Sequence, residues 1–356
     1  MINDNLQHDL SRAIELTLAK QAHPLLQSAA YVVKRAGQVS INLEAVNNLA
    51  GELSFDLSNN HAQCHWLESA PALVKSYLAA LTLQNRILFL TVFHTIGFCY
   101  WGNNSENSEN SKRWTVTLPE GVFSETKYDG AMALLVSMAI NQDFLNLDYL
   151  ASLDLEHFKA LLAGQFSENI DSLALLEERH EFIVSLAHKL RSENYLQALL
   201  PLLATTSAMA LALKLAHELP GYLDIAQYKG NEILFLKRAQ LLVSDINHTV
   251  KISKIEELTA FADYKLPQLL RHYQAISYEP ALASRVDQRS ELEPGSEEEV
   301  EIRATTIIAV ELLRQELEKR GVATSASTVD SQLWHLSQRL DKTIVQPYHR
   351  CKTVFY

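Results

Sequence analysis

The stretch EVEIRATTIIAVELLRQELEK, residues 299–319, predicts a long helix and points to the fold class of this 356-residue chain. Apolar residues recur along it at helical spacing, so one face is expected to turn towards a core. Gly321 follows the last periodic residue, at the position where glycine commonly caps a helix C-terminus. The expected inward face consists of Ile302, Ile307, Val310, Leu313 and Leu317.

Segments outside this helix favour the same helical class. The segment from Leu176 to Leu190 combines apolar positions at helical spacing with charged residues between them, which is typical of an amphipathic helix. Thr206–Leu219 is rich in Ala and Leu and ends at Pro220-Gly221, a helix stop signal. Strand-like pieces are short and occur at Gln38–Leu43, Thr115–Leu118 and Glu232–Phe235. The sequence therefore predicts a mainly α, compact helical fold with a minor β component.

We expect one unit, with an N-terminal lobe over about 1–125 and a helical part over about 126–356 that carries the candidate site residues. The hydrophobic fraction of 47% allows one large core or two closely packed lobes. The cysteines are Cys64, Cys99 and Cys351, an odd number without a CxxC pair, which argues against a disulfide framework or a cysteine-based zinc site. Because no secretory signal pattern is visible at the N-terminus either, we expect a cytoplasmic protein.

The net charge of −11 disfavours a polynucleotide partner, because the whole molecule repels a phosphate backbone, but it does not exclude a mononucleotide. Two apolar runs, Arg86–Trp101 and Ala198–Ala216, are expected to be buried helices and not membrane spans. The polar stretch Gly102–Ser111 predicts a flexible surface loop. Nothing in the sequence indicates the oligomeric state.

No Walker A loop, GxGxxG fingerprint, HExxH helix or GxSxG elbow occurs in the chain. The informative signal is a set of dispersed blocks that mix charged and aromatic residues. In chain order they are Lys237-Arg238-Ala239-Gln240, Phe261–Gln268, Glu299–Arg303, Asp330 with Leu333-Trp334, and Pro347–Tyr356.

In this order the blocks resemble those of the queuosine salvage family, whose members carry similar KRAQ, FADYR-PQ, EVEIR, D-x-x-LW and P-[YF]-HR motifs. The resemblance extends upstream to Ala29–Val33 with Val39–Asn42, and to Leu176–His180, so it covers nearly the entire chain. The chain departs from the pattern at His94 and Gly97, where the family usually has an acidic residue and Asn before its F-x-[FY]-W tetrad.

The resemblance implies a hydrolase that cleaves the N-glycosidic bond of queuosine 5′-monophosphate. The product would be the 7-deazaguanine base queuine, which is salvaged into tRNA modification. It further implies a small-molecule nucleotide substrate, no metal or organic cofactor, and a helical scaffold similar to that of DNA glycosylases.

Asp263 is the candidate catalytic residue. Cleavage of an N-glycosidic bond builds positive charge at the anomeric carbon, which an ionised carboxylate can stabilise, or it can activate the attacking water. Phe261 and Tyr264 are placed to exclude water and stack on a ring. A second interpretation is that Asp263 caps the N-terminus of a helix, which is compatible with catalysis. Its role as nucleophile, general base or ribose ligand stays open.

The remaining candidates are assigned to parts of the substrate. A 7-deazapurine lacks the N7 atom that other purine-releasing enzymes can protonate, so the base has to be stabilised through its remaining edge. For that edge, or for the amine of the queuine side arm, the candidates are Gln268, Asp245, Glu301 and Asp330. For the 5′-phosphate they are Lys237, and Arg303 or Arg350. His349 and Trp334 are divided between substrate contact and a core role, and Arg303 between phosphate binding and an ion pair with Glu299.

Three other functions compete with this one. A hydrolase of a related nucleoside or nucleotide would use the same chemistry on a different base. A non-catalytic helical module would keep a nucleotide pocket without turnover, but Lys237, Asp263 and Asp330 together argue against it. A glycosylase acting on duplex DNA would need a basic face, whereas Glu291–Glu301 is acidic.

Overall fold

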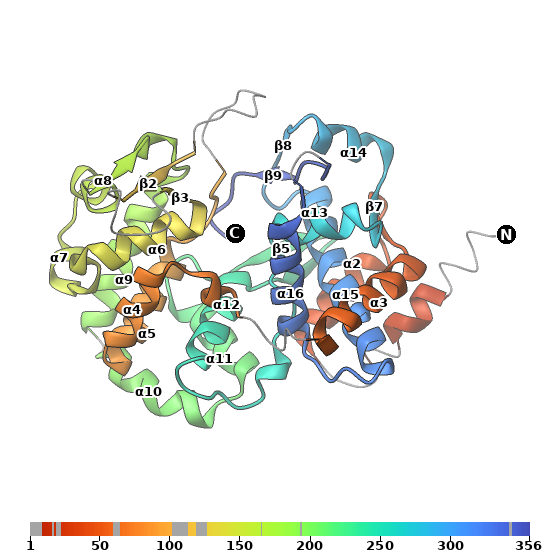
Figure 1. Ribbon diagram of the computed structural model, residues 1–356, viewed down its shortest axis with the longest axis horizontal. Helices are drawn as coiled ribbons and strands as arrows, with labels where there is room; N and C mark the ends of the chain where they lie inside the picture. The colour runs from red at the N-terminus through yellow and green to blue at the C-terminus, as the bar shows by residue number, and fades with distance from the viewer. Residues whose placement is uncertain are drawn as a thin grey trace. The chain divides into compact units, whose positions relative to one another are not determined.

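The computed structural model describes residues 9–15, 18, 23–59, 65–101, 113–118, 127–164, 166–192, 194–341 and 344–356. Most elements formed by these residues are helices, and the strands are short. The predicted mainly α class with a minor β component is therefore confirmed (Figure 1). The similarity to DNA glycosylases stays a prediction. Cys64, the predicted loop Gly102–Ser111 and the predicted lobe boundary near residue 125 lie outside the described residues.

The chain forms two compact units, and each is assembled from three separate segments. Unit 1 consists of Met1–Trp66, Asp224–Lys237 and Glu256–Cys351, and unit 2 consists of Leu67–Leu223, Arg238–Ile255 and Lys352–Tyr356. The helices of unit 1 include α2 (Pro24–Val33), α3 (Leu43–Asn59), α13 (Lys265–His272), α14 (Pro280–Asp287), α15 (Glu297–Lys319) and α16 (Ala326–Arg339). Its strands are β1 (Val39–Ile41), β5 (Ile225–Tyr228), β6 (Asn231–Leu234), β7 (Ile276–Tyr278), β8 (Glu291–Leu292) and β9 (Arg350–Cys351).

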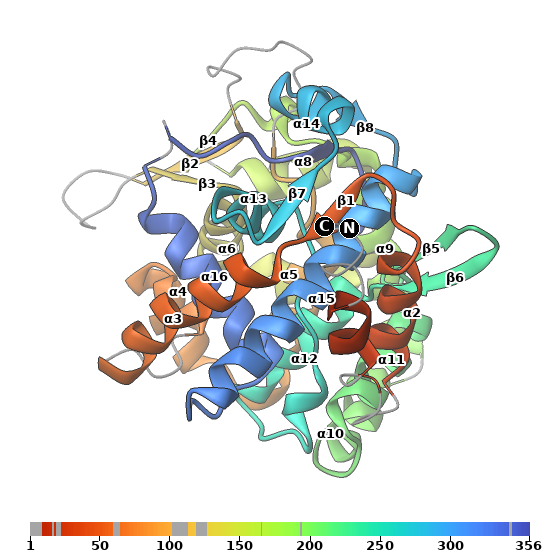
Figure 2. The same cartoon turned by 90° about the vertical axis from the view of Figure 1, so that its right-hand side faces the viewer.

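Helix α15 is the central element of unit 1, and α2, α3, α13 and α16 pack against it (Figure 2). Its ends follow local chemistry. The Ser296 hydroxyl accepts the Glu299 N–H at 3.3 Å, and Gly321, with φ of +82°, follows the C-cap residue. All five predicted inward residues are buried. The expectation of a single buried face was too narrow, however, because Glu299, Glu301 and Arg303 are buried as well.

The strands of unit 1 form two-stranded sheets that connect its helices. β1 pairs antiparallel with β7, and β8 pairs parallel with β9. β5 and β6 form a hairpin whose two turn residues, Lys229 and Gly230, have φ of 47° and 81°. Two positive φ values are characteristic of the type I′ turn, whose twist matches that of paired strands. The predicted strand pieces around residues 38–43 and 232–235 thus correspond to β1 and β6.

The described part of unit 2 is mainly helical and contains a three-stranded sheet, ordered β3-β2-β4. Its strands are β2 (Thr115–Thr117), β3 (Lys127–Asp129) and β4 (Ser167–Glu168). Its helices include α4 (Ala72–Ala80), α5 (Leu83–Ile96), α6 (Gly130–Ile140), α7 (Leu147–Ala151), α8 (Leu155–Ala163), α9 (Leu176–Ser192), α10 (Tyr195–Thr205) and α11 (Ala208–Glu218). Helix α12 (Lys237–Asn247) begins at the last residue of a unit 1 segment and continues in unit 2.

The two apolar runs are helical, as predicted. Ile87–Ile96 of α5 is buried at every position. The second run is divided between α10 and α11, because the Ser207 hydroxyl accepts the Ala210 N–H and starts a new helix. Within the part of the chain that the structure describes, no helix has both the length and the apolar character needed to cross a membrane.

Candidate functional site

Asp263 lies in the loop of unit 1 that leads into α13. Its Oδ1 accepts the backbone N–H groups of Lys265 at 2.7 Å and Leu266 at 3.3 Å, so it caps the start of this helix. The side chain is half-buried, and no described residue hydrogen-bonds to its Oδ2. The cap therefore fixes the orientation of the carboxylate through one oxygen and leaves the second oxygen available to a ligand.

Two buried ionisable side chains hold the peptide groups just before Asp263. The Oδ2 atom of Asp330, on α16, accepts the Phe261 N–H at 2.7 Å. The Nε atom of Arg303, on α15, donates to the carbonyl oxygen of Ala262 at 3.2 Å. Asp330 is 6% exposed and Arg303 is 1% exposed. The backbone of the loop is thus fixed from two different helices.

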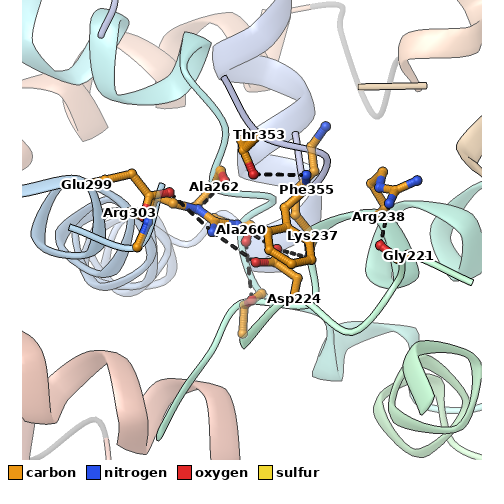
Figure 3. Close-up of polar contacts among 12 residues, drawn as sticks. Gly221, Asp224, Lys237, Arg238, Ala260, Ala262, Glu299, Arg303, Thr353 and Phe355 are labelled. Carbon is orange, nitrogen blue, oxygen red and sulfur yellow. Dashed lines mark hydrogen bonds and ion pairs between the residues drawn. The ribbon is translucent and has the colours of Figure 1, made fainter. Parts of the chain in front are cut away.

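Arg303 is itself held by two carboxylates, as Figure 3 shows. Its Nη1 and Nη2 atoms donate to Oδ1 and Oδ2 of Asp224 at 2.9 and 2.6 Å, and Nη1 also contacts Glu299 Oε1 at 3.4 Å. The guanidinium carbon lies 3.9 Å from the ring centroid of Phe235. The expected ion pair with Glu299 is therefore present, but the bidentate partner is Asp224.

Asp224 was missed at the sequence level. It is 2% exposed and lies in the connection between α11 and β5, where it accepts the Lys237 N–H at 3.1 Å with the same Oδ2 that binds Arg303. The only signal in the sequence was an acidic residue inside the apolar stretch Tyr222–Ile225, since a buried charge requires a partner. The partner, Arg303, is 79 residues away in the chain.

The charges of Asp263 and Lys237 both act on the carboxyl group of Asp330. Burial raises the pKa of Asp330 well above its usual range, and the negative charge of Asp263 raises it further. The Phe261 N–H and the Lys237 ammonium oppose this shift. Two carboxyl groups in different environments therefore share one neighbourhood, with the buried one favoured in its neutral form.

The aromatic and amide candidates next to Asp263 contact the C-terminal segment of unit 1. The rings of Tyr264 and Tyr348 are 4.8 Å apart, and the Lys265 ammonium lies 4.9 Å from the Tyr348 centroid. The Gln268 amide donates from Nε2 to the Gln346 carbonyl at 2.7 Å and accepts from Lys265 at 3.3 Å. Both ends of the Gln268 amide thus have partners within the chain.

Two further candidates, Glu301 and His349, are buried. The Glu301 carboxylate accepts N–H groups of Gly37 at 3.1 Å and Gln38 at 2.7 Å, and the Tyr228 hydroxyl at 2.8 Å, so it anchors the turn before β1. His349 is 1% exposed. Burial lowers the pKa of His349 to about 3, and the positive charge of Arg303 contributes in the same direction. His349 is therefore neutral near pH 7.

Trp334 is half-buried on α16, where its ring meets that of His335 at 77° with centroids 5.1 Å apart. Arg350, the alternative phosphate ligand, lies on β9 opposite Glu291 of β8. Among the described residues, no cluster of three or more His, Cys, Asp or Glu side chains is arranged to hold a metal ion.

Asp245 and the two positions that depart from the family pattern belong to unit 2. Asp245 Oδ2 lies 2.7 Å from His94 Nε2, and both side chains are buried. The carbonyl of His94 accepts a 2.7 Å hydrogen bond from Arg238, which also contacts the Gly221 carbonyl (Figure 3). A Cβ atom at Gly97 would lie 2.6 Å from the Phe93 carbonyl oxygen, so this helix end requires glycine.

Comparison with known proteins agrees with the resemblance seen in the sequence. A family model described as queuosine salvage protein matches residues 79–356. A Sphaerobacter thermophilus protein named queuosine 5′-phosphate N-glycosylase/hydrolase is 33% identical over 347 residues, which cover 93% of this chain and 97% of that protein. Proteins of the same name from Mus musculus and Nematostella vectensis are 29% and 22% identical, over 74% and 93% of this chain and 79% and 97% of their own lengths. The chain therefore belongs to the queuosine salvage protein family.

Proposed function

We propose that this protein hydrolyses the N-glycosidic bond of queuosine 5′-monophosphate and releases queuine for salvage into tRNA modification. The names of its relatives support this substrate. Within the chain, the observation that carries the proposal is the half-buried Asp263 carboxylate, oriented by its helix cap through one oxygen while the other makes no hydrogen bond to a described residue. We place the reaction in the cytoplasm, because a reducing compartment suits a chain with three cysteines and no CxxC pair.

The proposed roles follow from the charges of the site. Asp263 faces the developing positive charge at the anomeric carbon, or it orients the attacking water. Asp330, favoured in its neutral form, is a hydrogen-bond donor for the edge of the leaving base, which has no N7 to protonate. Lys237 supplies positive charge for the 5′-phosphate. Phe261 and Tyr264 exclude water around the sugar and base.

Replacement of Asp263 tests the core of the proposal. Asp263→Asn keeps an oxygen that can accept the Lys265 and Leu266 N–H groups, so the variant should fold like the wild type. We expect queuine release to fall by roughly 10²- to 10⁴-fold, the range for loss of a general acid or base. Asp287→Asn, which removes an exposed ion pair with Arg271, is the matched control and should keep normal activity. A folded Asp263→Asn protein with near-normal turnover would remove Asp263 from the mechanism.

The phosphate role is tested by pairing a substrate change with Lys237→Ala. We expect kcat/KM for the nucleotide to be lower in the variant. The decrease should correspond to a loss of about 1.5–3 kcal/mol in transition-state stabilisation, the contribution of a hydrogen bond to a charged group. The variant should act on the nucleoside as the wild type does, because the lost interaction is with the phosphate. Equal wild-type activity on nucleoside and nucleotide would instead favour a nucleoside hydrolase.

A further inference from the structure

The carboxylate of Asp224 connects two parts of the proposed site. Its Oδ2 accepts the backbone N–H of Lys237 at 3.1 Å and the Nη2 of Arg303 at 2.6 Å. Its backbone carbonyl accepts the N–H groups of Phe235 and Leu236 at 3.1 and 3.2 Å. Asp224 thereby fixes the strand-to-helix turn from which Lys237 emerges, and at the same time it orients the guanidinium of Arg303 (Figure 3).

Arg303 transmits this orientation to the loop of Asp263. Its planar fork faces Asp224, and the plane of the guanidinium directs Nε to the Ala262 carbonyl, which belongs to the peptide bond preceding Asp263. A rotation of the guanidinium would break the Asp224 fork, the Ala262 hydrogen bond, or both. The position of that peptide is therefore coupled to the position of Asp224.

We propose that Asp224 is a positioning residue for the glycosidic reaction, which sets the start of α12 at Lys237 directly and the loop of Asp263 through Arg303. The inference rests on the proposed function, because it depends on the roles proposed for Lys237 and Asp263. It assigns no substrate contact to Asp224 or Arg303. A buried ion pair alone explains little net stability, because desolvation of both charges offsets their attraction. What the fork provides is a fixed geometry, and misplacement of a reacting group by about 1 Å can reduce a rate by roughly 100-fold.

The proposal predicts different kinetic patterns for two variants. Arg303→Lys keeps a positive charge next to Asp224 but cannot form the fork and also reach Ala262, so kcat should fall by about 10- to 100-fold on nucleotide and nucleoside alike. Asp224→Asn should lower kcat similarly and also reduce the preference for the nucleotide over the nucleoside, because Lys237 loses its anchor as well. Arg314→Lys, in an ion-pair cluster with Glu311 and Glu318 on the same helix, is the control and should leave both quantities unchanged.

Hydrogen exchange of the ligand-free protein gives a readout that does not depend on activity. In Arg303→Lys, the amides of residues 261–266 should exchange faster than in wild type, while those of α2 and α3 should not change. Faster exchange in the loop with unchanged kcat per folded molecule would overturn the positioning role, as would wild-type exchange and wild-type kcat together. If Asp224→Asn fails to fold, Arg303→Lys alone decides the matter. Absence of queuosine 5′-monophosphate turnover in the wild type would contradict the proposed function, whereas the exchange result would still report on the network.

Discussion

Lowering the pH from 7 to 5 should destabilise the protein by about 2 kcal/mol through His349 alone. The folded protein lowers the pKa of this imidazole from 6.5 to about 3, because the ring is buried and faces the charge of Arg303. Since the folded-state pKa is below the unfolded one, the stabilisation is fully present above pH 6.5 and is lost as the pH falls towards 3. At pH 5 the unfolded chain binds a proton at His349 that the folded protein does not bind.

The magnitude follows from the two pKa values. pH 5 lies 1.5 units below the unfolded value of 6.5, and each unit corresponds to 1.36 kcal/mol, which gives about 2 kcal/mol. Titration of the full difference, from 6.5 to about 3, would give about 5 kcal/mol. The loss at pH 5 is thus a large fraction of the 5–15 kcal/mol by which native proteins are typically stable.

The test compares wild type with His349→Gln, which keeps a polar amide but cannot titrate. Free energies of unfolding are measured by urea titration at pH 7 and pH 5. Between these pH values the wild type should lose about 2 kcal/mol more than the variant. Other groups, including His23, whose pKa is also lowered by burial, contribute equally to both proteins and cancel. His188→Gln, at an exposed position on α9, should behave as the wild type. Equal losses in wild type and His349→Gln would show that His349 is not held neutral by burial.

Two further predictions concern stability. Asp330 has a raised pKa in the folded protein, so the stability it contributes is present at low pH and is lost as the pH rises through that pKa. As the pH is raised from 4 to 7, the Asp330→Asn protein should therefore become more stable relative to the wild type. Urea titrations at the two pH values measure this difference in the free energy of unfolding. Gly97→Ala should lower the free energy of unfolding by about 1–3 kcal/mol, because its Cβ would lie 2.6 Å from the Phe93 carbonyl oxygen. Gly51→Ala in α3, where a Cβ meets nothing within 4 Å, is its control and should be stabilising in thermal denaturation.

The parts of the fold that the sequence predicted correctly depend on local chemistry. Helix α15 starts two residues before the predicted Glu299 and ends at the predicted Lys319, because apolar periodicity and a following Gly321 are readable within a few turns. The burial of Glu301, which is not part of the predicted inward face, could not be predicted in this way. It depends on Tyr228 and on the backbone of Gly37, which are 73 and 264 residues away.

The candidate site shows the same division. Both interpretations of Asp263 started from one short segment, and the structure contains the helix cap that this segment predicted. Catalysis by Asp263 stays a prediction. The hydrogen bonds from the Phe261 N–H to Asp330 and from Arg303 to the Ala262 carbonyl join segments 69 and 41 residues apart. Motif order indicated that these residues matter, but their partners depend on the packing of α13, α15 and α16.

The sequence left two roles open for Arg303, phosphate binding and an internal ion pair, and the hydrogen bonds in the structure favour the ion pair. If Arg303 bound the phosphate, its Nη1 and Nη2 atoms would have to face the substrate. In the structure these atoms donate to Asp224, and Nη1 also contacts Glu299. A phosphate that took over this fork would displace a carboxylate from a buried guanidinium, and an unpaired buried carboxylate is costly. The loop before Asp263 would lose its anchor in the same step. We therefore favour Lys237 for the phosphate and assign Arg303 to the scaffold that orients Asp263, a division that the nucleotide-to-nucleoside ratios of Lys237→Ala and Arg303→Lys distinguish directly.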